Sequence, residues 1–315
     1  MIKLNNLKHK KKILLIGYSN LARRRLIKTF IKKKILFSVA SKSFKKKING
    51  AYRQFDNYDK ALKFSAADLV YLSIPNSMHF NLAKKILNYG YHLIVDKPIT
   101  TNLGELKKLI SIANKSNLML SEAVFYNYHS QFNYLKKFCG NLKKIEQIFV
   151  NFTIPTPEPS SLLASRELCG GALMDMGSYA ASIHRIFFKE RIISKDIIVK
   201  KNKKGLITSF DIFFKYNTKV LVGTFRFGGE YRNEIFVKLK NKTIEVNRLF
   251  SPPDDINLNL KINTKNKIKK IKIKKDNCFE NYLSEVIKNI KQKKFKYYQL
   301  NMLKDENLRL KIIGK

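Results

Sequence analysis

The stretch GGALMDMGSY, residues 170–179, carries two polar side chains inside what otherwise reads as an apolar helix. Asp175 and Tyr179 are four residues apart, so a helix places them on one face. Both side chains can take part in proton transfer. Taken alone, however, a tyrosine at this spacing is more often a packed residue whose hydroxyl has a partner. The question that the stretch raises is what this face of the helix meets.

A second candidate site lies near the N-terminus, where KILLIGYSNLARRRL reads as a strand, a glycine turn and a helix. A dinucleotide-binding fold holds the pyrophosphate here, at the positive end of the helix. The glycine fingerprint is incomplete, because Ser19 stands at its second position and Ala22 at its third. Ser19 still allows close backbone approach, and its hydroxyl can donate to a phosphate. The predicted contacts are Gly17, Tyr18, Ser19, Asn20 and Leu21.

Basic residues around this turn bear on the choice of cofactor. Arg23, Arg24 and Arg25 put positive charge into the first turn of the helix, which opposes its macrodipole unless an anion is near. After the second predicted strand, VASKSFKKK supplies Ser41, Lys42 and Ser43 where an NAD-preferring site supplies an acid. A hydroxyl and a cation suit a 2′-phosphate. NADP is therefore the predicted cofactor, NAD remains possible, and Lys42 can also be background in a lysine-rich chain.

The surrounding pattern predicts the elements that hold these residues. Up to about Val124, short apolar runs such as KILLIG, DLVYLSIP and HLIVDKP alternate with helical segments, which is typical of a doubly wound α/β domain with a parallel sheet. Later runs such as KIEQIFVNFTI and KIKKIKIKK alternate polar and apolar residues, as in a largely antiparallel sheet. We therefore expect a Rossmann domain over 1–124 and an α+β domain on an open sheet over 125–315.

Composition narrows the class of protein. The 315 residues include 63 Lys and Arg against 23 acidic residues, a formal charge of +40, but the lysines are spread along the whole chain. This distribution favours solvated faces over a nucleic-acid site, which usually gathers its basic residues on one face. We expect no specific nucleic-acid partner, no membrane span and no metal. Three isolated cysteines and the absence of a signal-peptide pattern favour the cytoplasm.

The segment YLSIPNSMHFNLAKKILNYGYHLIVDKPIT resembles the Gfo/Idh/MocA oxidoreductase family. The family carries a P-N-x-x-H element after its fourth strand, matched here by Pro75, Asn76 and His79, and E-K-P after its fifth. Asp96 replaces that glutamate, and Lys97 follows it. SEAVFYNYHSQF is similar to the segment that leaves the cofactor domain, with Asn127 where arginine is frequent. The resemblance implies further cofactor contacts at Ile74, Pro75, Asn76, His79, Asp96, Lys97 and Glu122.

The resemblance then reaches residues 170–179. The family begins a helix with G-G-x-x-x-D-x-G-x-H, and here Tyr179 stands where many members have histidine. With tyrosine at this position, the sequence resembles the branch of the family that contains the NDP-sugar 3-ketoreductases, glucose-fructose oxidoreductase and the dihydrodiol dehydrogenases. FRFGGEYRNEIFVKLKNKTIEVNRLFSPP also resembles the second domain of sugar-modifying members. The likeness covers nearly the whole chain.

This likeness implies a chemistry. Carbonyl reduction by a nicotinamide needs a group that gives a proton to the nascent alkoxide. Tyrosine and lysine are both protonated at neutral pH, and an ammonium close to a phenol lowers the phenol's pKa. We expect Tyr179 to be the acid/base, Lys97 to bind the reacting oxygen and tune Tyr179, and Asp175 to orient the substrate hydroxyl or Lys97.

Several functions remain open on the sequence. The leading one is reduction of a keto sugar, with a nucleotide-linked sugar favoured by family analogy alone. The alternatives are oxidation of a free polyol, sugar or dihydrodiol, and a cofactor-binding regulatory protein without turnover. Weaker substrate candidates are His129 and Arg166, whereas a structural role is expected for His184. The resemblance also implies a homodimer or homotetramer.

Overall fold

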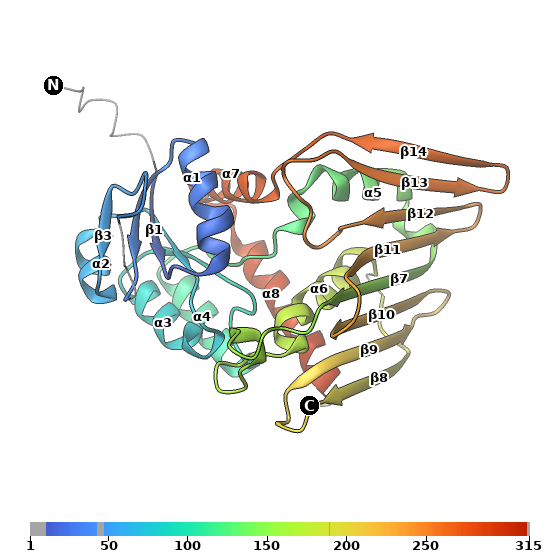
Figure 1. Ribbon diagram of the computed structural model, residues 1–315, viewed down its shortest axis with the longest axis horizontal. Helices are drawn as coiled ribbons and strands as arrows, with labels where there is room; N and C mark the ends of the chain where they lie inside the picture. The colour runs from blue at the N-terminus through green and yellow to red at the C-terminus, as the bar shows by residue number, and fades with distance from the viewer. Residues whose placement is uncertain (1–10, 43–46, 189, 314–315) are drawn as a thin grey trace. The chain divides into compact units, whose positions relative to one another are not determined.

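The computed structural model describes residues 11–42, 47–188 and 190–313 (Figure 1). Within them the chain forms two compact units. The first holds the described residues up to Ala123 together with Leu283–Leu303, and the second holds Val124–Tyr282 together with the described residues from Lys304 on. Helices α7 (Cys278–Lys291) and α8 (Lys296–Ile313) are therefore each divided between the units. The boundary after residue 124 stays a prediction.

The first unit is built on a six-stranded parallel sheet with the order β3-β2-β1-β4-β5-β6. Its strands are β1 (Lys12–Ile16), β2 (Leu36–Ala40), β3 (Arg53–Phe55), β4 (Leu69–Leu72), β5 (His92–Val95) and β6 (Leu120–Glu122). This order is that of the Rossmann fold, so the predicted doubly wound domain is confirmed. The order reverses between β1 and β4, and ligands of such sheets bind outside the carboxyl ends of the strands at this point.

Helical segments connect the strands of the first unit. They are the π-helical turn η2 (Ala22–Leu26), α1 (Ile27–Lys32), α2 (Tyr58–Phe64), η3 (Asn76–Met78), α3 (His79–Asn88) and α4 (Leu103–Lys115). Apart from the edge strand β3, the strands are apolar runs with almost every residue buried, as expected where helices cover a parallel sheet. N-cap side chains mark where helices begin. At the start of α4, the Asn102 side chain accepts a hydrogen bond of 2.9 Å from the Glu105 N–H.

The second unit is built on an eight-stranded sheet with the order β14-β13-β12-β11-β7-β10-β9-β8. Its strands are β7 (Ile145–Ile154), β8 (Ser194–Lys201), β9 (Ile207–Lys215), β10 (Val220–Phe227), β11 (Arg232–Leu239), β12 (Lys242–Asn247), β13 (Leu258–Thr264) and β14 (Lys267–Ile273). Neighbouring strands are antiparallel except β7 and β10, which are parallel. The predicted mainly antiparallel sheet is confirmed.

Helices of the second unit pack on one face of this sheet (Figure 1). They include α5 (Ser130–Cys139) and α6 (Ala172–Phe187), with shorter turns at η4 (Tyr126–Tyr128), η5 (Leu142–Lys144) and η6 (Leu162–Ala164). The core of the unit lies between α6 and the sheet, where residues such as Leu173, Phe187 and Phe210 are fully buried. The alternating strands therefore turn their apolar residues toward α5 and α6, and α6 carries the Asp175 and Tyr179 pair.

Candidate active site

The glycine turn after β1 lies against the segment that follows β4. Gly17 has φ +99°, and a Cβ built on it would stand 1.9 Å from the carbonyl oxygen of Ser73. Its N–H donates to the carbonyl of Ala40 at 2.8 Å. Only glycine fits these constraints, because a side chain would collide with backbone in a conformation that L-residues avoid. The turn therefore exposes backbone rather than side chain at the edge where a pyrophosphate binds in this fold.

Ser19, at the second fingerprint position, turns its hydroxyl into the protein. Its Oγ lies 2.6 Å from the Oγ of Ser73 and accepts a hydrogen bond of 3.1 Å from the Ala22 N–H. The serine thus joins the glycine turn to the end of β4. This differs from the expected direction toward a phosphate.

The basic residues of the turn have partners close by. Arg23 donates to the side-chain oxygen of Asn20, and its guanidinium lies 5.6 Å from the ring centroid of Tyr18. Arg24 is exposed. Part of the positive charge at this helix start is therefore explained by local contacts, without an anion.

At the end of β2, the two residues proposed for a 2′-phosphate differ in exposure. Ser41 is buried, and its N–H donates to the carbonyl of Phe55 at 3.0 Å. Lys42 is exposed, with its ammonium 5.6 Å from the ring centroid of Tyr58. Burial raises the pKa of Tyr58, so its phenol adds no charge beside this lysine near neutral pH. Ser43 lies outside the described residues.

The element after β4 is held by His79, which is completely buried. Its Nε2 lies 2.9 Å from the carbonyl oxygen of Ile74, and its Nδ1 lies 2.8 Å from that of Pro98. The ring thereby joins the loop after β4 to the loop after β5. Pro75 and Asn76 lie in the sequence between Ile74 and this histidine. Contact of this histidine with the cofactor stays a prediction.

The acid of the D-K-P motif meets two hydroxyls. Tyr71 donates to Asp96 Oδ1 at 2.6 Å, and the Ser73 hydroxyl donates to Oδ2. Burial raises the pKa of the Asp96 carboxyl, while these two hydrogen bonds act in the opposite direction. Lys97 follows, joined to Pro98 by a cis peptide bond. Glu122 supports this loop, because its Oε1 accepts a hydrogen bond of 3.0 Å from the Ile99 N–H.

In the second unit, three glycines allow α6 to begin and pack where it does. A Cβ on Gly170 would lie 2.5 Å from the carbonyl oxygen of Leu162, and Gly171 has φ +99°. A Cβ on Gly177 would lie 3.0 Å from Cδ of Arg309, which is buried in α8 and paired with Glu306. The glycines of the motif are thus explained by close packing around the helix.

Asp175 and Tyr179 lie on a face of α6 that is only partly buried within this unit, whereas most of their neighbours on the helix are buried. The ring of Tyr179 stacks on Phe250 with centroids 4.7 Å apart. It also meets Phe152 and Tyr126 edge to face, at 5.6 Å and 5.7 Å. Aromatic neighbours on three sides therefore fix the direction of this phenol.

Two weaker candidates of the second unit are engaged elsewhere. His129 is buried, with Nδ1 accepting from the Gln131 N–H at 3.1 Å and Nε2 lying 3.1 Å from the carbonyl oxygen of Asp276. Burial lowers the pKa of His129, consistent with a neutral ring that caps α5. Arg166 donates to the carbonyl of Lys204 at 3.2 Å. These contacts do not support a substrate role, which stays a prediction for both residues.

His184 is hydrogen-bonded to the hydroxyl of Tyr216 through Nδ1, and the two rings stack with centroids 5.7 Å apart. Burial, with smaller effects of Lys311 and Arg185, lowers the pKa of His184 to about 4. These contacts agree with the structural role expected for this histidine.

Sequence reasoning missed the residues that support the site. Phe250, Phe152 and Tyr126 surround Tyr179, and they come from three separate segments of the chain. Tyr71 and Ser73 hold Asp96. The sequence carried a signal for Tyr71 and Ser73, because they place hydroxyls at the carboxyl end of an otherwise apolar strand.

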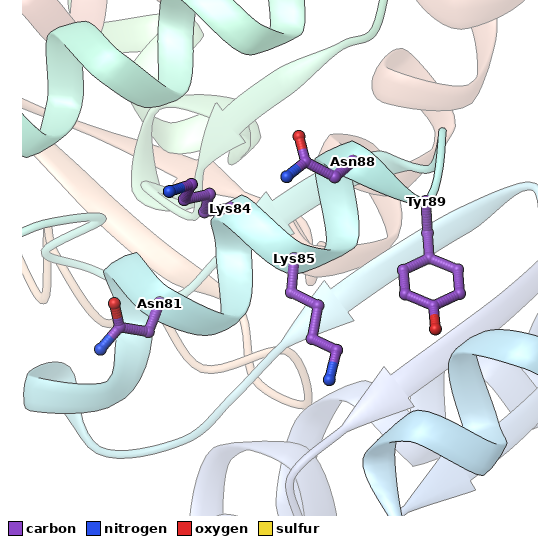
Figure 2. Close-up of a pocket in the computed structure, with 5 residues that line it drawn as sticks. All are labelled: Asn81, Lys84, Lys85, Asn88 and Tyr89. Carbon is purple, nitrogen blue, oxygen red and sulfur yellow. The ribbon is translucent and has the colours of Figure 1, made fainter.

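Two surface hollows in the described part of the chain contain none of the candidate site residues. One lies on α3 and is lined by Asn81, Lys84, Lys85, Asn88 and Tyr89, with Lys85 and Tyr89 extending from the same side of the helix (Figure 2). Lys85 pairs there with Asp59. Over the part of the chain that the structure describes, no cluster of His, Cys, Asp or Glu can hold a metal ion. No helix among those residues has the length and apolar character needed to cross a membrane.

Comparison with known proteins agrees with this fold. Residues 11–124 match the GFO_IDH_MocA model, described as an oxidoreductase family with an NAD-binding Rossmann fold. The dTDP-3,4-didehydro-2,6-dideoxy-alpha-D-glucose 3-reductase of Saccharopolyspora spinosa is 29% identical over 132 residues, 41% of this chain and 40% of that protein. D-xylose 1-dehydrogenase (NADP(+)) 2 of Haloferax volcanii is 25% identical over 135 residues, 42% of each chain. The matches thus span about two fifths of these relatives' lengths.

A solved structure extends the likeness to both units. KijD10, a 3-ketoreductase from Actinomadura kijaniata solved with NADP and TDP-benzene, superposes with a TM-score of 0.89 over 97% of both chains at 17% identity. At this identity the superposition establishes a shared fold. Residues 11–124 are thus similar to the Gfo/Idh/MocA family of oxidoreductases, in agreement with the resemblance read from the motifs of the sequence.

Proposed function

We propose that this protein is an NADP-dependent oxidoreductase that reduces the carbonyl of a keto sugar. The observation that carries the proposal is the partly exposed Asp175 and Tyr179 face of α6, a helix most of whose residues are buried, in a chain whose residues 11–124 match an NAD-binding family. A carboxylate and a phenol that stay partly exposed at this spacing can serve in proton transfer.

The residues of the first unit fit a dinucleotide. The backbone lines the turn at Gly17, because a Cβ there would meet the Ser73 carbonyl oxygen at 1.9 Å. We expect this turn to hold the pyrophosphate and the exposed Lys42 to hold the 2′-phosphate, with NAD as the possible alternative. The nicotinamide end is assigned to the loops after β4 and β5 and to the end of β6, through Ile74, Pro75, Asn76, His79, Asp96, Lys97 and Glu122.

The bound nicotinamide supplies the hydride in this chemistry. Tyr179 gives a proton to the alkoxide oxygen that forms on reduction and takes it back in the reverse direction. Lys97 donates a hydrogen bond to the same oxygen, and its positive charge stabilises the tyrosinate that remains. Asp175 orients the substrate hydroxyl or Lys97. Such acid/base assistance is worth about 10² to 10⁴ in rate.

Two relatives with different substrates bear on the substrate class. The S. spinosa relative is a reductase of a dTDP-linked sugar, and the H. volcanii relative is a dehydrogenase of free xylose. We favour a nucleotide-linked keto sugar, because the solved 3-ketoreductase with TDP-benzene shares its fold with the whole of this chain. Oxidation of a free sugar, polyol or dihydrodiol is the second candidate.

We also propose a homodimer or homotetramer, formed through the uncovered face of the eight-stranded sheet. Phe213, Val222, Phe149 and Phe236 are adjacent in register on four neighbouring strands. The three phenylalanines are 40%, 45% and 38% exposed along this row. The row continues into Glu245 and Lys261. Opposite charges beside an apolar row suit a second copy turned by a twofold axis.

Sedimentation tests this assembly. The wild-type chain should sediment as a dimer or tetramer, and Phe149→Lys should shift it toward monomer. No disulfide joins Cys139, Cys169 and Cys278 within the described residues, which supports a cytoplasmic location as part of the proposal.

The function is tested first without a substrate, by following nicotinamide fluorescence while NADPH and NADH are titrated into the protein. Micromolar binding of NADPH supports the proposal, and a screen of keto sugars then follows. Tyr179→Phe should bind NADPH as the wild type does and lose turnover by about 10² or more. Absence of binding of either nucleotide at low millimolar concentration would favour a protein without this cofactor and overturn the proposal.

A further inference from the structure

A chain of hydrogen bonds runs through the carboxyl edge of the parallel sheet. Tyr71 donates to Asp96 Oδ1 at 2.6 Å, and Ser73 donates to Oδ2. The Ser73 Oγ lies 2.6 Å from the Oγ of Ser19, which accepts from the Ala22 N–H at 3.1 Å. These hydrogen bonds link Asp96, which precedes Lys97, to the end of β4 and to the glycine turn. Tyr71 and Ser73 are completely buried, so water does not compete for their hydrogen bonds to Asp96, whereas Ser19 is partly exposed.

The number of protons on these groups fixes which group donates in each hydrogen bond. A serine hydroxyl has one proton to donate, and an ionised carboxylate has none. Ser73 gives its proton to Asp96, so it can only accept from Ser19. Ser19 therefore gives its single proton to Ser73 and accepts from Ala22. While Asp96 is ionised, the hydroxyl of Ser19 has no proton left for a phosphate.

We propose that Asp96 is a positioning residue for dinucleotide binding, which acts on the glycine turn through Ser73 and Ser19. The inference rests on the proposed function and deepens it. Ser19, in the place of a glycine, fastens the turn to the sheet so that backbone N–H groups rather than its hydroxyl meet the pyrophosphate. Asp96, which precedes Lys97, couples the shape of that turn to the loop that carries the lysine.

The short acid suits this role. The hydroxyl of Tyr71, in β4, and that of Ser73, directly after β4, both reach the carboxylate of an aspartate, each on a different oxygen. Burial raises the pKa of Asp96, and the hydrogen bonds from Ser73 and Tyr71 oppose that rise, so the two donors favour the ionised form that sets the direction of the chain.

The alternative is that Asp96 contacts the cofactor directly, as the family resemblance implies. The two possibilities differ in additivity. If Asp96 acts through Ser19, then removing either residue breaks the same link, and a second removal costs nothing more. If Asp96 touches the cofactor independently, the two losses multiply, as is usual for separate contacts.

The experiment is a double-variant cycle on NADPH binding by the full chain, with Asp96→Asn, Ser19→Ala and the pair combined. We expect each single variant to raise the Kd about tenfold, as for loss of one hydrogen bond to a charged group. The double variant should stay within twofold of the singles. Ser65→Ala is the matched control, because its buried hydroxyl has no partner among the described residues and its Kd should be that of the wild type.

The outcomes separate the inference from the function on which it rests. A double variant weakened about a hundredfold, or an Asp96→Asn Kd within twofold of the wild type, overturns the inference and leaves the cofactor assignment intact. If the wild type binds neither NADPH nor NADH, both are overturned. Should Asp96→Asn fail to fold by circular dichroism, Ser73→Ala takes its place, and the same lack of additivity with Ser19→Ala is expected.

Discussion

The ring of Tyr179 stacks on that of Phe250, with centroids 4.7 Å apart and planes inclined by 24°. Phe250 follows β12, far along the chain from α6, and is itself buried against Phe152 and Tyr126. The proposed acid/base is therefore aimed by a ring that contributes no chemistry of its own. This separation of aiming from reacting makes the role of Phe250 measurable.

Replacement of Phe250 by leucine should lower kcat about tenfold and leave the NADPH Kd unchanged, because Tyr179 loses its stacked neighbour and samples unproductive directions. The control is Phe210→Leu, which makes a comparable cavity in the same core beside Phe225. Steady-state kinetics with the keto sugar identified by the screen provides the measurement. Equal losses of kcat in both variants would show a general effect of core packing instead.

Gly17→Ala should destabilise the first unit by about 3 kcal/mol and abolish NADPH binding. The added Cβ would meet the Ser73 carbonyl oxygen at 1.9 Å at a φ of +99°. Gly90→Ala is the matched control, since Gly90 has φ +84° with no atom within 4 Å of its Cβ position. That variant should cost only about 1 to 2 kcal/mol, the cost of the backbone conformation. Urea unfolding compares the two, and equal costs would contradict the close approach.

Lys42→Ala should weaken NADPH about tenfold and leave NADH within twofold, because the ammonium at the end of β2 is assigned to the 2′-phosphate. Lys63→Ala is a suitable control, since Lys63 also lies over an aromatic ring, that of Phe64, but sits on α2. Fluorescence titration at one salt concentration measures the NADPH and NADH affinities of the wild type and of both variants. A parallel loss for NADH would assign Lys42 to a different part of the cofactor.

Stability should fall at mildly acidic pH because of His184. Its pKa is lowered to about 4 in the folded chain, first by burial, against about 6.5 when unfolded. Between these values the unfolded chain binds more protons than the folded chain, so the free energy of unfolding rises with pH over this window. The stability that His184 contributes is therefore lost as the pH falls from about 6.5 toward 4. The wild type should lose about 2 kcal/mol between pH 7.5 and 5 from this group alone.

His184→Asn keeps an acceptor for the Tyr216 hydroxyl and does not titrate. Urea unfolding of this variant should show a loss smaller by that amount over the same pH interval. His92 and His129, whose pKa values are also lowered by burial, affect both proteins equally. An identical pH dependence in the two proteins would show that His184 is not a buried neutral ring.

The order of elements was open to prediction because it depends on local periodicity. Continuous apolar runs indicated the parallel strands, and the alternation in KIKKIKIKK indicated β14 with one wet face. The helix expected after Gly170 is α6, from Ala172 to Phe187. The spacing of Asp175 and Tyr179 likewise predicted a shared face, because four residues make about one turn of a helix.

The sequence by itself thus determined which segments become strands and helices, which residues belong to the motifs, and which pair shares a face of α6. Only the tertiary structure decided the partners of those residues. Ser19 turns inward because the register of β1 and β4 brings Ser73 beside it. Phe250 reaches Tyr179 because the chain returns to α6 after β12. Such contacts depend on strand order and chain return, which join distant residues and leave no periodic trace in the sequence.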